Sequence, residues 1–283
     1  MLSSSSIVLL LLVTPFVISQ HGPPPDQNTC TDNVPEFPLP QAKTSECEDF
    51  SNGNSYDYPS DFNVTNNVTW YECPESGLRM VVANDIPDHD VKVNNPNNPC
   101  YIPYWIVFPL YPELADSVTE PSNLGIIAMA IDGVSVYGAQ EGGGTNAVEP
   151  AAGSMVQDAQ YWYGHCETEH RWHYHNPQLG HENMPDENTL MAYAMDGFPI
   201  YGPVSNPDSD LDECNGMKHD DGSYRYHVRT LDQVDGDASY CNGDSPAIQW
   251  NYVIGCWAGE LGKTTVTDAS DLEIPTDCQV VKY

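Results

Sequence analysis

The chain has 283 residues, with 9 Lys and Arg against 41 Asp and Glu, so its formal net charge is −32. A surface with so few cations lacks the basic footprint that binds phosphates, which excludes nucleic acid as a partner and disfavours anionic membrane surfaces. The same charge attracts cations, so divalent cations, a mineral face or a cationic surface or partner stay open as alternatives.

The first nineteen residues contain an apolar run from Ile7 to Ile18, with Val17 and Ser19 at the positions that a signal peptidase reads. We expect residues 1–19 to be a signal peptide, because the run is too short to span a bilayer, and no later segment predicts a membrane span. The sequence therefore predicts a secreted protein with an extracellular location.

Residues 20–69 are rich in Pro, Asn, Ser and Asp and show no helical or strand period, which indicates an extended N-terminal arm. Two acceptor sequons begin at Asn63 and Asn67 and predict glycosylation in an exported chain. The chain also holds 9 cysteines, which an oxidising compartment converts to disulfides. Because the number is odd, we expect four bridges, whose connectivity the spacing does not decide, and one remaining thiol.

Residues 70–260 are expected to form one β-rich globular domain, followed by a C-terminal tail over 261–283. Apolar runs between Pro and Gly clusters predict strands at 79–83, 101–108 and 251–257. Helical periodicity is scarce. The fold class is therefore expected to be mainly β, disulfide-bonded, with few helices.

An internal duplication organises this domain. Asp132-Gly-Val-Ser-Val-Tyr-Gly138 returns as Asp196-Gly-Phe-Pro-Ile-Tyr-Gly202, and each copy leads to a cluster that ends in Tyr-His. Apolar alternation around each Asp-Gly pair predicts a two-residue type I′ hairpin turn. In the second hairpin Pro199 would then face Ala194, on an edge strand or at a bulge. We expect the two related halves to pack as a pair.

The first copy ends in Trp172-His173-Tyr174-His175. Side chains alternate along a strand, so both imidazoles of this His-x-His lie on one face and can chelate a metal. Further nitrogens must come from elsewhere, and the candidates are His165, His227 and His89. Three or four imidazoles suit Zn(II) or Cu(II). The alternative is a structural network in which each imidazole is hydrogen-bonded to backbone or carboxylate.

Other groups of carboxylates give less specific signals. Asp132 and Asp196 invite an acid–base interpretation, but the turn alone explains an Asp there. An alternation of three carboxylates looks like the start of a calcium loop: Asp208, Asp210 and Asp212. Glu213 and His219 stand where an EF-hand needs Gly and a bidentate Glu, so an EF-hand is rejected and weak calcium binding stays open.

The order of these motifs resembles the YHYH domain family, whose Tyr-His-Tyr-His tetrad appears as Trp172-His173-Tyr174-His175. Similar elements follow in family order over about residues 80 to 259, at 85–89, 94–97, 126–138, 164–165, 196–203, 211–216, 226–227 and 252–256. In the second copy Arg225 stands in place of a His, so a symmetric pair of metal sites is not expected. The resemblance implies a secreted or surface protein and no established reaction.

Taken together, these patterns favour a secreted YHYH-domain protein that binds a transition metal through its His-x-His cluster. The alternative is an acidic extracellular structural or matrix protein that contacts calcium or mineral, with purely structural His and Tyr motifs. A metal-dependent or carbohydrate-acting enzyme ranks lower, because no carboxylate pair is assigned and no Gly-x-Ser-x-Gly elbow occurs. Whether the chain is an enzyme stays open.

Overall fold

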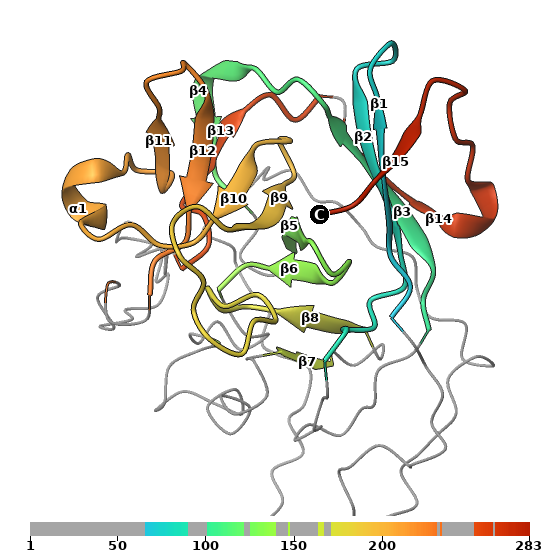
Figure 1. The fold of residues 1–283 in the computed structure, drawn as a ribbon, viewed down its shortest axis with the longest axis horizontal. Coiled ribbons are helices and arrows are strands. Elements are labelled where there is room, and N and C mark those ends of the chain that lie inside the picture. Colours follow the sequence, from blue (N-terminus) through green and yellow to red (C-terminus); the bar gives the residue numbers. More distant parts are fainter. Residues whose placement is uncertain are drawn as a thin grey trace, which may run out of the picture.

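The computed structural model describes residues 66–89, 101–121, 125–139, 147, 164–166, 171–230, 233, 252–262 and 264–283. The expected signal peptide and most of the N-terminal arm, with Asn63, lie outside these residues, whereas Asn67 is described and exposed. The described part is mainly β, as predicted (Figure 1), and its helices are short, such as α1 (Pro207–Asp210) and η4 (Ala269–Asp271).

A five-stranded antiparallel sheet joins the two ends of the described chain. Its order is β14-β3-β2-β1-β15. The bounds of its strands are β1 Thr69–Cys73, β2 Leu78–Ala83, β3 Tyr104–Pro109, β14 Thr265–Asp268 and β15 Gln279–Val281. Both edge strands come from the C-terminal segment that was expected as a tail, and a disulfide between Cys73 and Cys278 fastens it across a sequence separation of 205.

A second sheet has eight strands in the order β11-β12-β10-β9-β5-β6-β8-β7. The bounds are β5 Ile126–Ala130, β6 Ser135–Tyr137, β7 Gly164–Cys166, β8 Trp172–Tyr174, β9 Leu190–Ala194, β10 Pro199–Tyr201, β11 Gly216–Lys218 and β12 Tyr224–His227. A short pair of β4 (Leu114–Thr119) and β13 (Trp257–Gly259) completes the described strands. The strand expected over 251–257 is wrong, because 252–256 is a bend whose Gly255 N–H bonds to the Cys214 carbonyl.

The eight-stranded sheet carries the duplication as a two-fold pseudo-symmetry. Its centre is the antiparallel β5–β9 pair, in which Met129 faces Tyr193. On either side the order repeats: β6 runs parallel to β8 with Val136 opposite Tyr174, and β10 runs parallel to β12 with Ile200 opposite Tyr226. The outer strands β7 and β11 each add in antiparallel fashion. The two halves therefore share one sheet, and equivalent residues occupy equivalent positions.

Each Asp-Gly pair lies in a hairpin loop, but the loop has three residues and not two. In the first hairpin the Ala130 N–H donates to the Val134 carbonyl at 2.9 Å, which leaves Ile131, Asp132 and Gly133 in the loop. A type I′ turn needs positive φ at both central residues, whereas here Gly133 has φ 85° and Asp132 does not have a positive φ. A three-residue loop with its left-handed residue at Gly therefore replaces the predicted turn.

The second hairpin repeats this geometry and shifts the predicted register by one residue. The Ala194 N–H donates to the Phe198 carbonyl at 2.9 Å, and Gly197 has φ 90°. Pro199 consequently faces Tyr193 and not Ala194. β10 lies between β9 and β12 and is no edge strand, although its register shifts just beyond the proline.

One hydrophobic core joins the two large sheets. Trp70 of β1 packs against Tyr193 of β9 with ring centroids 5.4 Å apart, and its indole N–H donates to the Ile131 carbonyl at 2.9 Å. The fully buried Trp257 of β13 donates in the same way to the Ile127 carbonyl at 3.1 Å. Both large rings thus bury their apolar area while their single donors stay bonded.

Candidate metal centre

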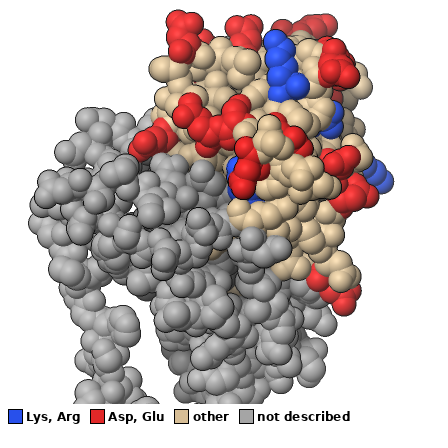
Figure 2. Space-filling view, turned by 90° about the vertical axis from the view of Figure 1, so that its left-hand side faces the viewer, with Lys and Arg blue, Asp and Glu red and all other residues tan. Residues whose placement is uncertain are grey.

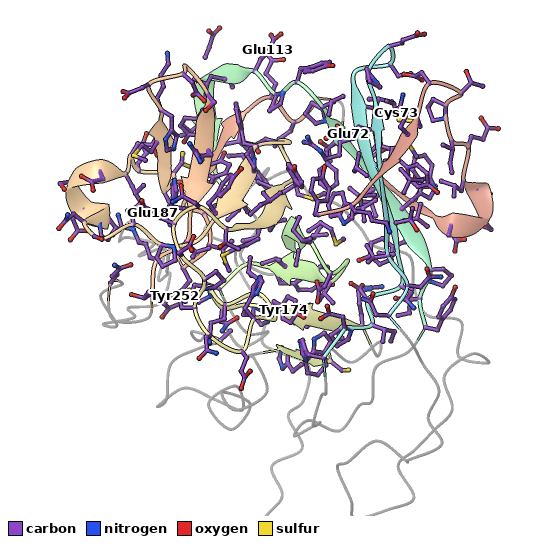
Figure 3. The ribbon with its side chains drawn as sticks, in the orientation of Figure 1. Glu72, Cys73, Glu113, Tyr174, Glu187 and Tyr252 are labelled. Carbon is purple, nitrogen blue, oxygen red and sulfur yellow. A yellow bond between two sulfur atoms is a disulfide. The ribbon has the colours of Figure 1, made fainter. Side chains whose placement is uncertain are left out.

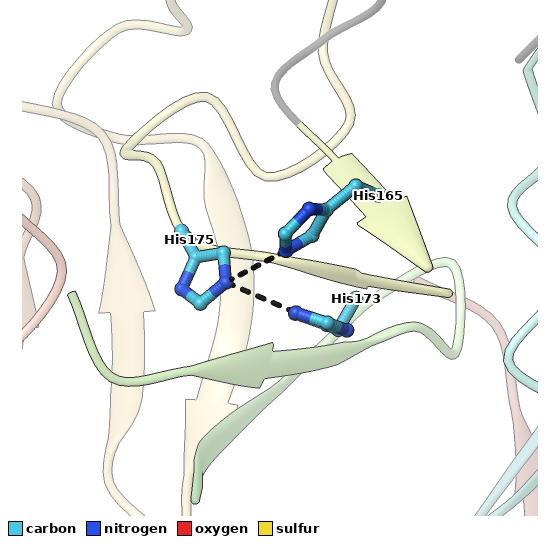
Figure 4. Close-up of side chains that lie close together, drawn as sticks. All are labelled: His165, His173 and His175. Atoms are coloured by element: carbon cyan, nitrogen blue, oxygen red, sulfur yellow. Dashed lines mark hydrogen bonds between the residues drawn. The ribbon is translucent and has the colours of Figure 1, made fainter. Parts of the chain in front are cut away.

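Three histidines meet at the outer edge of the eight-stranded sheet (Figure 4). β7 and β8 pair so that His165 lies directly opposite His173, and cross-strand partners share a face of the sheet. His175 follows β8 two residues after His173, so strand alternation returns its ring to the same face. Pairing and alternation together bring three side chains from two strands to one point.

The rings approach through their Nε2 atoms. His173 Nε2 lies 3.0 Å from His175 Nε2, and His165 Nε2 lies 3.2 Å from the same atom. One ligand nitrogen from each ring lies within 4.8 Å of the others. All three side chains are buried, with 3% exposure for His173 and His175 and 8% for His165.

Backbone carbonyls fix the orientation of two of these rings. His173 Nδ1 lies 3.2 Å from the Arg171 carbonyl, and His175 Nδ1 lies 2.6 Å from the Gly138 carbonyl. A carbonyl only accepts, so each Nδ1 must carry the proton and each neutral ring must present a lone pair at Nε2. The 3.0 Å contact of His173 and His175 therefore places two acceptors face to face. An electron-poor centre between them, a proton or a metal ion, is needed to satisfy both.

Burial disfavours the proton as that centre. It lowers the pKa of His175 to about 4, against which the bond to the Gly138 carbonyl is the smaller effect. Burial, and next to it the other rings of the group, lower the pKa of His165 and of His173 well below the usual histidine value. The three imidazoles are thus neutral at neutral pH, which is the form that ligates metals.

A buried polar chain supports His173 from behind. The Tyr137 ring stacks on the His173 ring with centroids 4.1 Å apart and an interplanar angle of 17°. The Tyr137 hydroxyl accepts from Arg171 at 3.2 Å, and the Arg171 guanidinium lies 3.7 Å from the buried carboxylate of Asp85. The same Arg171 supplies the carbonyl that orients His173. These contacts hold ring plane and tautomer together, as outer partners do around metal-bound histidines.

Gly164 lets β7 come close enough to place His165. A Cβ at this position would stand 2.5 Å from the indole of Trp172, which is fully buried and cannot move aside. Gly216 has the equivalent role at the ring of Tyr224 in the second copy. The Gly-His of the sequence is therefore a steric requirement of the strand pair.

Gly164→Ala is expected to lower the free energy of unfolding by about 1–3 kcal/mol, because overpacking a filled core forces side chains and backbone apart. It should also displace His165 from the histidine group, because His165 moves with β7. Gly262→Ala is the matched control, since a Cβ there meets nothing within 4 Å. Urea unfolding checks the prediction, and equal stabilities of the two variants would contradict it.

The other two histidines that the sequence proposed lie elsewhere. His89 Nε2 is 2.8 Å from the Tyr174 hydroxyl, and Tyr174 alternates with His173 and so points to the opposite face of β8. Figure 3 labels Tyr174 in the half of the sheet that holds β7 and β8. His227 ends β12 in the other half of the pseudo-symmetric sheet. Of the five proposed ligands, the structure thus brings together His165, His173 and His175.

The two loop aspartates do not form a carboxylate pair with each other. Asp132 accepts from the Tyr174 hydroxyl at 2.7 Å, and Asp196 accepts from the Tyr226 hydroxyl at 2.5 Å. Burial raises the pKa of Asp132 to about 7 and that of Asp196 to about 6, with the tyrosine hydrogen bonds opposing this. Each Asp-Gly motif therefore bonds the Tyr-His motif of its own copy. Their joint repetition in the sequence was the signal for this pairing, and our sequence analysis missed it.

The three alternating aspartates also have separate partners. Asp208 pairs with Arg229 at 2.6 Å, Asp210 accepts from the Ser209 hydroxyl, and Asp212 accepts from the Tyr224 hydroxyl and two backbone N–H groups. Within the described ranges, the His165, His173 and His175 group is the one set of three metal-ligand residues that converges.

Two of the four expected disulfides lie among the described residues. Besides the bridge to Cys278, Cys214 is bonded to Cys256 across a sequence separation of 42, and Cys166 is a buried thiol in β7. The remaining cysteines lie outside the described residues: Cys30, Cys47, Cys100 and Cys241. None of the helices described is long and apolar enough to span a bilayer.

Comparison with known families confirms the resemblance for part of the range inferred from the motifs. Residues 105–209 match the model of a family described as YHYH protein. This stretch contains the first Asp-Gly hairpin, all three clustered histidines and the second hairpin. Neither the curated proteins nor the solved structures contain a match to the chain.

Proposed function

We propose that this chain, whose residues 105–209 are of the YHYH protein family, binds one transition metal ion through the Nε2 atoms of His165, His173 and His175. The observation that carries the proposal is the contact between His173 and His175, whose Nε2 lone pairs face each other at 3.0 Å. Backbone carbonyls hold both rings in this tautomer, and burial keeps them neutral. A shared metal ion satisfies both lone pairs at once.

The spacing fits the metals that imidazole prefers. Zinc–nitrogen bonds of about 2.0–2.1 Å at a tetrahedral angle put neighbouring ligands about 3.3–3.4 Å apart. The observed separations of 3.0 and 3.2 Å need only a small outward movement of the rings. Zn(II) and Cu(II) are the proposed metals, since an all-imidazole set disfavours calcium and magnesium.

Three protein ligands leave a fourth tetrahedral position for a small molecule or another group. In zinc proteins a closed four-ligand set is typical of structural sites, whereas three ligands plus water are typical of catalytic ones. In the part of the chain that the structure describes, no fourth His, Cys, Asp or Glu joins the group. The bound metal would supply Lewis acidity there, and the chain's own contribution is to hold three neutral nitrogens in a water-poor environment.

The direct test is the metal content of protein secreted from its host without added metal or chelator. We expect close to one zinc or copper per chain by elemental mass spectrometry. The proposal fails if the protein, with circular dichroism showing it folded, contains neither metal and takes up neither from micromolar solutions.

Acid should release the metal at a lower pH than the one at which free imidazole becomes protonated. Burial is the reason, because it lowers the pKa of His175 to about 4, below the ordinary histidine value of 6.5. The ring nitrogen therefore stays unprotonated, and protons displace the metal only in more acidic solution. We expect the metal to stay bound at about pH 5.5, where an exposed histidine is mostly protonated. Dialysis at stepped pH, followed by elemental analysis, checks this. Half-release near pH 6.5 would contradict it.

A second candidate is an acidic extracellular structural protein that contacts calcium or mineral. Figure 2 supports it, because acidic side chains are scattered over the described face with few basic ones among them. Secretion and glycosylation, which both candidates require, are consistent with two disulfides and with the exposed Asn67. This surface should bind calcium weakly and at many sites, and changes in the histidine group should not affect that binding.

A further inference from the structure

The pseudo-symmetry assigns a counterpart to each residue of the metal centre. In the second copy Met217 lies opposite Arg225 across β11 and β12, as His165 lies opposite His173. His227 takes the place of His175: its Nδ1 lies 2.8 Å from the Gly202 carbonyl, as that of His175 lies near the Gly138 carbonyl. The second copy thus has one imidazole in an equivalent position and two replacements.

The replacement of a histidine by Arg225 changes what the second copy can bind. Its guanidinium lies over the Tyr201 ring, 4.9 Å from the centroid, where His173 stacks on Tyr137 in the first copy. Arginine keeps its charge at all relevant pH values and accepts no hydrogen bond, so it repels a metal ion and favours an anion. A cation site and its counterpart therefore differ in the sign of the charge that they attract.

Three buried polar atoms in this counterpart have no hydrogen-bond partner. These atoms are Nε2 of His227, a residue that is only 1% exposed, Nε2 of His219 and Nε of Arg225. The rings of His219 and His227 have centroids 5.8 Å apart, and Arg225 alternates with His227 on the same face of β12. Nearly all buried polar groups in proteins are hydrogen-bonded. Three neighbouring atoms without partners therefore indicate a ligand that supplies the missing hydrogen bonds.

We propose that Arg225, His227 and His219 together bind the carboxylate group of a small molecule or a chain end. The Nε edge of a guanidinium matches a carboxylate, which accepts from it through parallel hydrogen bonds. His227 already donates through Nδ1 to Gly202, so Nε2 donates to the second carboxylate oxygen once the ring is protonated. Binding therefore takes up a proton.

The charges around these three residues favour a singly charged ligand. Burial, and next to it Arg225, lowers the pKa of His219, and Asp221, Asp220 and Glu187 oppose this. Burial also lowers the pKa of His227, and Glu187 is a smaller opposing effect. Figure 3 labels Glu187 in the half of the sheet that holds β12. Both rings are therefore neutral before a ligand binds, and these carboxylates and the net charge of −32 repel a phosphate dianion more than a carboxylate.

The test is a titration of the metal-loaded protein with sodium acetate, followed by the 15N shifts of the histidine ring nitrogens. We expect saturable shifts at His227 and His219, with proton uptake in calorimetry, and none with sodium chloride at equal ionic strength. Inorganic phosphate should bind more weakly than acetate. Arg225→Met, which keeps an apolar stem on Tyr201, should weaken acetate by about 10- to 100-fold.

Lys218→Met is the matched control, because it removes the same charge from the neighbouring exposed position of the hairpin and should leave acetate binding unchanged. Arg225→Lys keeps the charge without the Nε edge and should also weaken acetate. Shifts that follow ionic strength, that survive Arg225→Met, or that are absent would overturn the proposal. Metal titration of Arg225→Met should match that of the wild type, so this outcome is independent of the metal proposal.

Discussion

Replacing His175 by phenylalanine is expected to weaken zinc and copper binding by at least about 100-fold. Loss of an outer hydrogen-bond partner of a metal ligand already weakens binding by about 10- to 100-fold, and this change removes a ligand itself. His175 is the central residue of the group, because its Nε2 atom makes both short contacts, one to His165 and one to His173. Phenylalanine keeps the ring volume, so the core stays filled. Competition with a chromophoric chelator measures the effect.

The pseudo-symmetry supplies the control for this change. His227→Phe removes an imidazole that is also buried and makes the equivalent Nδ1 contact to a glycine carbonyl, but from the half that holds Arg225. We expect it to bind metal as the wild type does. Equal losses of metal affinity in both variants would indicate that the changes disturb the fold and do not remove a specific ligand. A folded His175→Phe protein with wild-type affinity would reject the site, and the acidic surface would then account for any metal found.

Removing the Cys73–Cys278 disulfide by a double change to alanine should lower the free energy of unfolding by about 2–5 kcal/mol. The bridge closes a separation of 205 residues and fastens β15 to β1, so the unfolded chain gains much freedom without it. The C-terminal strand should exchange its amide protons faster than β2 and β3. Urea unfolding and hydrogen exchange measure the two effects.

The Cys214–Cys256 bridge is the matched comparison, since it closes a separation of only 42 residues. Loop-closure entropy alone makes its removal less harmful by about 1.4 kcal/mol, from the logarithm of the ratio of the two separations, 205 and 42. A larger loss for the shorter loop would show that local packing outweighs chain entropy here.

Local patterns carried most of the correct fold predictions. The Asp-Gly pairs placed both hairpins, because alternation around a turn signal is a property of neighbouring residues. The loop length was wrong by one residue, since Asp-Gly suits two loop types and only the φ of Asp132 separates them. In the structure the Asp132 carboxylate accepts from the Val134 N–H and from the Tyr174 hydroxyl, and Tyr174 lies 42 residues away.

The histidine group shows the same division between local and distant information. Strand alternation put His173 and His175 on one face, which needs only their spacing. The choice of His165 over His227 and His89 required the pairing of β7 with β8, which the sequence does not encode locally. The buried Arg171 and Asp85, which lie 86 residues apart, were missed for the same reason.

The C-terminal segment illustrates the limit most clearly. Residues 261–283 have little apolar pattern of their own, so a tail was expected. Their order comes from partners far away in the chain: β15 pairs with β1, and β14 pairs with β3. Short strands of this kind gain stability from the sheet that receives them, and no window of the sequence contains that sheet.

The most direct measurement of the central claim is the X-ray absorption spectrum of the protein loaded with one equivalent of zinc or copper. If the metal lies between His165, His173 and His175, the spectrum will show three nitrogen ligands at about 2.0–2.1 Å with the outer-shell scattering of imidazole rings. A shell made of oxygen atoms, without imidazole scattering, would contradict the account and place the metal on the acidic surface.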